Sequence, residues 1–395
     1  MSTGTISTAR RWSMLAIALS STMFANVFIN GAAFLIPTLH ERRGLNLAQA
    51  GLFSAMPSVG MVFTLIAWGY AADRYGERIV LALGSALTAA AAFAAAASTS
   101  LVLTGVFLLL GGMAAAASNS ASGRLVVGWF PPQRRGLTMG IRQTAQPLGV
   151  GLGALVIPGV AHTYSIGAAL LFPAILCAVS ALVSAVGVVD PPRPPREQAP
   201  QEHLANPYRG SSVLWRIHAV SVLLVVPQVV VWTFTLVWLM VDRGWSATAA
   251  GALVTGAQVL GACGRIAAGR WSDRAGSRLR PIRTIAIAAA AAMAAVALTD
   301  YLGSPLSIAL IVVASVITVS DNGLAFTAIA EIAGPFWTGR ALGTQNTSQL
   351  LTAGIVPPLF GGLIAVAGYP AAFALCAVFP VVAFPLVPVD AEAVV

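Results

Sequence analysis

The chain consists of long apolar runs that alternate with short polar segments. A helix that crosses the hydrocarbon core of a bilayer needs about 20 mostly apolar residues, and the runs are of about this length. The pattern therefore predicts an all-α integral membrane protein with twelve transmembrane helices. The expected spans are residues 12–36, 48–70, 79–98, 101–127, 137–160, 166–189, 213–241, 247–269, 283–301, 305–331, 340–365 and 370–388.

The composition agrees with a membrane protein. Hydrophobic residues make up 57% of the 395 residues and charged residues only 9%, whereas soluble domains carry about 25% charged residues. The net charge of +9 comes from arginine alone, because the chain has no lysine.

The arginines orient the protein in the bilayer. Nearly all arginines at the ends of spans fall on one side of the predicted topology, and only Arg42, Arg43 and Arg243 fall on the other. Positive residues favour the cytoplasmic side, so we expect a multi-pass protein of the cytoplasmic membrane with both termini in the cytoplasm. The charge therefore predicts no nucleic-acid partner.

A charged hairpin occurs twice, two hundred residues apart. Residues 69–78 read GYAADRYGER and residues 269–278 read GRWSDRAGSR, so Gly, Asp, Arg and Gly share one register. Other polar positions continue the repeat at a shift of 202 or 203 residues. Asn26, Asn30, Asn119, Gly136, Gly140, Thr144 and Gln146 fall on Gln228, Trp232, Asn322, Gly339, Gly343, Thr347 and Gln349.

This duplication predicts two pseudo-symmetric six-helix bundles. Residues 1–189 form the expected N-terminal bundle and residues 213–395 the C-terminal bundle. The segment between them, residues 190–212, is polar and rich in proline. Such a segment favours extended backbone, so we interpret it as a cytoplasmic linker.

The paired hairpins, twelve spans and central linker resemble the major facilitator superfamily across essentially the whole chain. The resemblance implies two bundles that expose a site near the middle of the membrane alternately to each side. It also implies that helices 1, 4, 7 and 10 line the cavity, with helices 2, 5, 8 and 11 at the bundle interface.

The hairpins are expected to act as conformational latches. Gly69 and Gly269 allow another helix to approach closely, so that Asp73 and Asp273 lie against the positive N-terminal ends of helices 11 and 5. Glu77 stands where the superfamily usually has a basic residue. An orientation signal without a latch is the alternative. The other expected latch residues are Arg74, Arg78, Arg124, Arg274, Arg278 and Glu331.

Charges inside the predicted spans are candidates for function, because each costs several kcal/mol in a bilayer. Residues 261–269 read GACGRIAAG, which resembles helix 8 of monocarboxylate and oxalate/formate-type carriers, where the arginine binds substrate carboxylate. Arg265 is therefore a substrate candidate, although Gly261 stands where those families often have an acid. The alternative is that Arg265 reaches the membrane interface.

A second arginine follows a connection, residues 129–136, that is similar to those of organic-anion and nitrate carriers. Arg142 is expected near Arg265, with Gln146 one turn further on the same face. A planar guanidinium suits a carboxylate, and the alternative is again that Arg142 reaches the membrane interface. The remaining cavity candidates are polar or aromatic and could equally join helices by hydrogen bonds; they are Asn26, Asn30, Asn119, Gln228, Trp232, Asn322, Asn346 and Gln349.

Asp321 is the acid that lies in the middle third of a predicted span. Loss of hydration disfavours a charged carboxylate, so Asp321 is a candidate carrier of a coupling proton. A structural acid that pairs with an arginine across the bundle is the alternative. Glu331 lies two to three turns away and is interpreted as a latch partner.

The sequence lacks signatures of catalysis, metal binding or ATP use. Its four histidines are scattered, its three cysteines lie in apolar runs as expected for buried free thiols, and a phosphate-binding loop would need a lysine. We therefore expect no enzyme activity, no cofactor and no metal.

The leading hypothesis is a monomeric secondary active transporter of a small organic anion of carboxylate type, with proton symport. The alternative is a proton-coupled exporter of drugs or metabolites. Gly140, Gly149 and Gly153 match part of an exporter signature in helix 5, but Ala154 replaces its proline. A third hypothesis is a receptor or lipid-interacting scaffold without transport.

Overall fold

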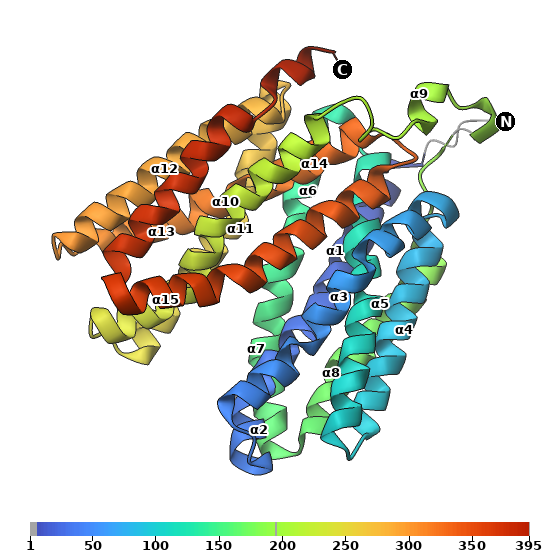
Figure 1. The fold of residues 1–395 in the computed structure, drawn as a ribbon. Coiled ribbons are helices and arrows are strands. Elements are labelled where there is room, and N and C mark those ends of the chain that lie inside the picture. The colour runs from blue at the N-terminus through green and yellow to red at the C-terminus, as the bar shows by residue number, and fades with distance from the viewer. Residues whose placement is uncertain (1–5, 194–195, 395) are drawn as a thin grey trace. The chain divides into compact units, whose positions relative to one another are not determined.

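The structure is a computed structural model that describes residues 6–193 and 196–394. Every element in these two ranges is helical (Figure 1). Eleven of the described helices are long and apolar enough to cross a membrane. The all-α membrane fold predicted from the apolar runs is thus confirmed.

The first half of the chain begins with α1, which continues through a short 3-10 segment into α2. The bounds of its helices are α1 Thr8–Gly31, η1 Ala32–Leu35, α2 Ile36–Arg43, α3 Leu47–Tyr75, α4 Glu77–Ala97, α5 Leu101–Trp129, α6 Pro132–Gln143, α7 Ala145–Thr163 and α8 Ile166–Gly187.

The second half follows two short linker helices, η2 Arg196–Gln198 and α9 Gln201–Leu204. The bounds of its helices are α10 Val213–Val237, η3 Trp238–Asp242, α11 Ala247–Ala275, α12 Leu279–Tyr301, α13 Leu306–Ser320, α14 Asn322–Ala333, α15 Thr338–Leu386 and η4 Val389–Val394. α15 contains two of the predicted spans. They are separated at Gly368, where the backbone is not helical (φ 78°, ψ 174°).

Polar side chains at the helix starts explain several boundaries. Asn46 and Gln49 form a capping box at the start of α3, and the hydroxyl groups of Ser100, Ser165 and Ser246 accept amide hydrogen bonds at the starts of α5, α8 and α11. Such caps satisfy backbone donors that would otherwise lack partners in the first turn.

Two predicted spans consist of two helices that follow each other almost without a break. α6 and α7 meet at Thr144, and α13 and α14 meet at Asp321, and both residues have α-helical backbone angles. The carbonyls of Thr144 and Asp321 accept from the amides of Leu148 and Ala325, so each pair of helices forms one span. The seventh span ends in a π-helical turn, Trp238–Asp242, which the apolar pattern did not show.

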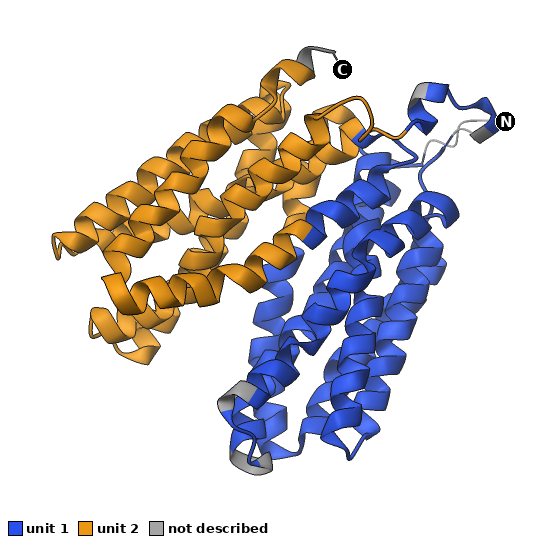
Figure 2. Cartoon of the chain, in the orientation of Figure 1, with its two compact units in different colours: residues 1–130, 144–205, 333–347 blue, residues 131–143, 206–332, 348–395 orange. Residues whose placement is uncertain are grey.

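The helices form two compact units, and each contains a segment from the other half of the sequence (Figure 2). Unit 1 comprises residues 1–130, 144–205 and 333–347, and unit 2 comprises residues 131–143, 206–332 and 348–395. The predicted domains, residues 1–189 and 213–395, differ from these units mainly by the exchanged segments 131–143 and 333–347. The predicted linker, residues 190–212, is divided between the units after residue 205.

The two units are packed differently inside. Unit 1 contains buried hydroxyl contacts between helices, such as Ser21 with Ser184 at 3.2 Å and Ser85 with Ser180 at 3.1 Å. Unit 2 has an apolar core that includes Trp238, Met293 and Phe373. Close packing and interhelical hydrogen bonds are the usual means of joining helices within a bilayer.

The cysteines are free. Cys177 and Cys376 are buried, as expected from the sequence, whereas Cys263 is exposed, so that expectation was wrong for Cys263.

Candidate functional site

The second hairpin binds the start of α6. Asp273, near the end of α11, accepts hydrogen bonds from the backbone amides of Gly136 at 2.9 Å and Leu137 at 2.8 Å. These amides belong to the fifth and sixth residues of α6, near its N-terminal end, where the helix dipole favours a negative charge. We call this contact the second latch.

The first hairpin makes the equivalent contact with the start of α15. Asp73, near the end of α3, accepts hydrogen bonds from the amides of Gly339 at 2.7 Å and Arg340 at 3.1 Å. The Arg340 guanidinium adds an ion pair with Asp73 at 3.0 Å. We call this contact the first latch. Its geometry repeats that of the second latch at the shift seen in the sequence.

Glycine pairs allow both latches to form. A methyl group on Gly269 would overlap the carbonyl oxygen of Gly136, and a methyl group on Gly69 would overlap that of Gly339. The helix backbones therefore touch directly at both places. The contacts extend one turn along each pair of helices, because Gly140 packs against the Arg265 carbonyl in the same way.

Arg278 organises the charges of the second latch. It pairs with Asp273 at 2.6 Å and with Glu331 at 3.2 Å, and it donates to the Pro132 carbonyl at 2.5 Å. Burial lowers the pKa of the Arg278 guanidinium, but Glu331 and Asp273 outweigh this effect and raise it above its ordinary value. Arg135, on α6, also pairs with Glu331, at 3.3 Å.

A different charge cluster supports the first latch. The Glu77 side chain is fully buried and pairs with Arg124 and with Arg193, the latter at 2.8 Å. Arg124 also donates to the Pro335 carbonyl at 2.8 Å. Arg193 and Arg135 were missed from the sequence, because nothing in their neighbourhoods shows which distant helix end they approach.

Three predicted latch residues lie outside these contacts. Arg74 is exposed and donates to the Tyr70 hydroxyl at 3.1 Å. Arg78 is exposed and donates to the Ala185 carbonyl at 2.7 Å, and Arg274 is exposed on the surface of α11. Their place beside the repeated aspartates suggested a shared role, but their side chains lie on the outer face of the hairpins.

Arg265 lies at a small cavity in unit 2 whose lining includes several polar side chains. It is 3% exposed, and the cavity beside it has a volume of about 30 Å³, which is the space of one water molecule. The guanidinium donates to the Gln143 carbonyl at 3.3 Å, while its Nε has no partner. The cavity is lined by Gln228, Val231, Trp232, Thr235, Val254, Ala257, Gln258, Arg265, Ser315, Thr318 and Val319.

Gln228, Trp232 and Arg265 were predicted to contact substrate, and all three line this small cavity; Gln258, which also lines it, was not predicted. Gln258 lies seven residues before Arg265 on α11, a spacing of two helical turns that puts both on one face. That spacing was the available signal.

Arg142 lies close to the same point. It is 2% exposed, donates to the Gln143 side chain at 2.5 Å and lies over the Phe326 ring at 5.9 Å. Gln143 thus holds both arginines, one through its side chain and one through its carbonyl. Arg142 is not among the residues that line the cavity.

Asp321 lies between α13 and α14 and has α-helical backbone angles. It is 1% exposed, and its Oδ2 atom has no hydrogen-bond partner. It is close enough to Arg265 to interact electrostatically, but no ion pair within 4.0 Å joins these two described residues. A buried carboxyl without a cation in contact is costly when ionised.

Three amide side chains form a chain next to Asp321. Asn322 donates to Gln228 at 3.0 Å and accepts from Gln349 at 3.4 Å. Three predicted site residues, from α10, α14 and α15, are thereby brought together. Their side-chain amides supply part of one another's hydrogen bonds. This agrees with the alternative that these residues join helices and do not contact substrate.

The other predicted site residues belong to unit 1. Asn26, Asn30 and Asn346 donate to backbone carbonyls one turn earlier in their own helices. Asn119 donates to the Met61 sulfur at 3.7 Å, and Gln146 is exposed. Their predicted contact with substrate stays a prediction.

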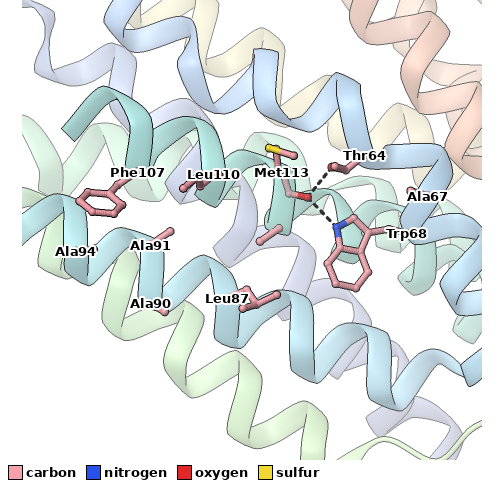
Figure 3. Close-up of a pocket in the computed structure, with 11 residues that line it drawn as sticks. Thr64, Ala67, Trp68, Leu87, Ala90, Ala91, Ala94, Phe107, Leu110 and Met113 are labelled. Atoms are coloured by element: carbon pink, nitrogen blue, oxygen red, sulfur yellow. Dashed lines mark hydrogen bonds between the residues drawn. The ribbon is translucent and has the colours of Figure 1, made fainter. Parts of the chain in front are cut away.

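A much larger cavity in unit 1 has the wrong chemistry for an anion. It measures about 680 Å³ and is lined mainly by alanine and larger apolar residues of α3, α4 and α5 (Figure 3). Its two main polar groups, the Thr64 hydroxyl and the Trp68 indole, both donate to the Met113 carbonyl, at 2.6 and 2.8 Å. They are therefore already engaged.

The sequence profile of the Major Facilitator Superfamily matches residues 14–357. The chain belongs to the Major Facilitator Superfamily. The uncharacterized MFS-type transporter Rv2994 of Mycobacterium tuberculosis (strain ATCC 25618 / H37Rv) is 58% identical over 379 residues, which cover 96% of this chain and 85% of that protein.

Solved structures of the superfamily share the fold. The human organic anion transporter MFSD10 (TETRAN) superposes with a TM-score of 0.77 at 19% identity, covering 97% of this chain and 100% of that one. The proton:xylose symporter XylE gives a TM-score of 0.77 at 16% identity, covering 96% and 95%. The chain is thus a multi-pass membrane transporter with the twelve-helix fold of the Major Facilitator Superfamily.

Proposed function

We propose that the chain is a secondary active transporter that moves a small organic anion of carboxylate type, with proton symport, by alternating access. The observation that carries this proposal is the state of Arg265. Its guanidinium is buried in unit 2, lines a small cavity together with other polar side chains, has an unpartnered Nε and has no carboxylate of a described residue within 4.0 Å.

A buried cation of this kind needs an anion. An unpaired guanidinium in low dielectric is costly, and a carboxylate can accept two parallel hydrogen bonds from it. Gln228, Gln258 and Thr318 line the same cavity and offer further polar contacts. MFSD10, one of the structural neighbours, is an organic anion transporter, and this supports the same substrate class.

Asp321 is the proposed proton carrier. Its buried, unpartnered Oδ2 atom favours the neutral acid, because the charged form would lack both water and a donor. Its position between α13 and α14 places the carboxyl in the middle of a membrane span. A closer approach of the Arg265 guanidinium would stabilise the carboxylate and so release the proton.

The latches would govern the alternation between states. We propose that the hairpin side faces the cytoplasm, as the arginine distribution predicts, and that the protein acts as a monomer in the cytoplasmic membrane. Each latch joins the end of a helix from one half of the sequence to the start of a helix from the other half, so both must break for these helix ends to separate.

A ligand-stabilisation screen tests the proposed substrate class. Purified protein is heated with a panel of small carboxylates and a panel of hydrophobic cations. We expect at least one carboxylate to raise the unfolding temperature. Arg265→Lys should lower affinity for that carboxylate about tenfold or more, because a charged hydrogen bond contributes about 1.5–3 kcal/mol.

Arg270→Lys is the matched control, because Arg270 is exposed on the same helix. It should bind the carboxylate like the unmodified protein. Stabilisation by hydrophobic cations alone would contradict the anion proposal and favour export.

The exporter alternative has one structural feature in its favour. Methyl groups on Gly140 and Gly149 would overlap backbone carbonyls of Arg265 and Met23, so two glycines of the partial signature lie at close helix contacts. Gly153, in contrast, meets only an ordinary contact with Phe34 at 3.4 Å. Counterflow of the stabilising compound in liposomes would separate both transport hypotheses from a scaffold without transport.

A further inference from the structure

The start of the linker is fixed against the first hairpin. Trp129 donates to the Val189 carbonyl at 2.8 Å, and Asp190 accepts from the Arg78 amide at 2.7 Å. Gly76 has a φ of 98°, and a side chain there would overlap the Asp190 carboxylate. This part of the linker is therefore built into unit 1.

Arg193 then reaches the end of α3, the helix that carries Asp73. Its guanidinium donates to the carbonyls of Asp73 at 2.8 Å and Ala72 at 3.0 Å. These carbonyls belong to the last turn of α3, where the helix dipole is negative. The Ala72 carbonyl also accepts from the Gly76 amide at 3.2 Å. Arg193 thus caps the helix end at the latch residue itself.

The same guanidinium holds the buried acid of the hairpin. Arg193 donates to both carboxylate oxygens of Glu77, at 2.8 and 3.0 Å. Arg124 binds Glu77 from the other side and also donates to the Ala72 carbonyl. Two guanidiniums from distant parts of the sequence therefore fix one acid and one helix end.

The second hairpin is built differently. Ser277 stands at the position that corresponds to Glu77, and its carbonyl accepts from the Ser272 hydroxyl at 2.8 Å. The stabilising cation is Arg278, which lies five residues from Asp273 in the hairpin itself. The first hairpin receives this support from the linker instead.

We infer that Arg193 is a positioning residue for the first latch, so that the linker between the two halves forms part of the latch. Arg193 holds the α3 carbonyls in place and thereby aligns the Asp73 carboxylate with the amides of Gly339 and Arg340. Its own contacts all lie within the first half of the chain, so they persist when the latch opens. This inference rests on the latch function proposed above.

The test measures how often the start of α15 becomes accessible. Thr338 is 3% exposed beside the first latch, so a single cysteine at Thr338, in a chain without its native cysteines, reports opening by its rate of labelling with a membrane-impermeant maleimide. No substrate is required. Arg193→Ala should raise this rate about 5- to 30-fold, as expected for loss of a few charged contacts.

Arg193→Lys should raise the labelling rate less than Arg193→Ala does, because it keeps the charge. It should not restore the unmodified rate, because an ammonium cannot bind two carbonyls and a carboxylate in one plane. If Arg193→Ala does not fold, Arg193→Lys is measured in its place. Arg209→Ala, at an exposed arginine of the same linker, is the control and should label at the unmodified rate. In an Asp73→Asn background, Arg193→Ala should add less than about twofold, because both changes act through one contact.

The results separate this inference from the latch itself. If Asp73→Asn raises labelling while both Arg193 variants do not, the role of Arg193 is overturned and the latch stands. If Asp73→Asn leaves labelling unchanged, the latch fails and the inference fails with it. Full additivity of Arg193→Ala and Asp73→Asn would also overturn the inference, because it would show that Arg193 does not act through Asp73.

Discussion

Loss of charge at either latch aspartate should open the hairpin side. In Asp273→Asn, the side chain keeps one oxygen and can accept from only one of the two α6 amides that now bind it. Hydrogen bonds to a charged group contribute about 1.5–3 kcal/mol each. We therefore expect the latched state to be destabilised by about 1–3 kcal/mol, which changes the open population about 5- to 150-fold.

Asp73→Asn should have the larger effect. Its ion-pair partner Arg340 lies on α15, so this pair exists only while the latch is closed. Arg278, the partner of Asp273, lies in the same hairpin and stays with Asp273 when α6 moves away. Neutralising Asp73 therefore removes one more interaction that distinguishes the two states. The double variant should open further than either single variant.

Cysteine labelling from the hairpin side measures this prediction. Single cysteines at Thr138 and Thr338, both buried, report the second and first latch. Asp242→Asn is the control, because its side chain is 48% exposed and it lies before the start of α11, at the opposite end of that helix from the second hairpin. Rates within about twofold of the unmodified chain, in both single variants and in the double variant, would refute the latch.

Two further predictions concern proton coupling and helix contact. Asp321→Asn imitates the protonated acid permanently, so it should abolish accumulation driven by a pH difference but leave exchange across liposomes largely intact; continued accumulation would make Glu331 the next candidate. Gly269→Ala places a methyl group against the Gly136 carbonyl and should speed labelling at Thr138, because overpacking costs about 1–3 kcal/mol. Gly256→Ala, on the same helix but facing open space, should leave the labelling rate at Thr138 unchanged. Equal labelling rates in the two glycine variants would exclude the direct helix contact.

The repeat in the sequence was enough to predict which helix ends the two hairpin aspartates contact. Gly and Asp occur in one register at residues 69–73 and 269–273, and the glycines that receive them, Gly136 and Gly339, occur at the matching shift. Short-range chemistry explains this success, because a close helix approach requires glycine and an unsatisfied helix start favours an acid. Both requirements are local and appear directly in the residue types.

The ion pairs around the latches could not be predicted in the same way. Glu77 and Arg124 are 47 residues apart, and Arg193 comes from a linker whose proline content indicated only extended backbone. Several arginines at the helix ends were equivalent in sequence, and only packing shows that Arg74 is exposed while Arg124 is buried. The π-helical turn at Trp238–Asp242 was also invisible, since an apolar run does not show where the helical hydrogen-bond pattern changes.

The second latch and the candidate site both lie between α6 and α11. The proposed opening of the latch and the proposed binding of substrate therefore involve the same two helices. Asp273 and Arg265 lie eight residues apart on α11, while Gly136, Gly140 and Gln143 lie on α6 opposite them. When α6 separates from α11, the Gln143 carbonyl leaves the Arg265 guanidinium, which then needs another acceptor. A bound carboxylate provides that acceptor, so substrate on Arg265 should lower the cost of opening the second latch and leave the first latch, which has no such arginine, unaffected.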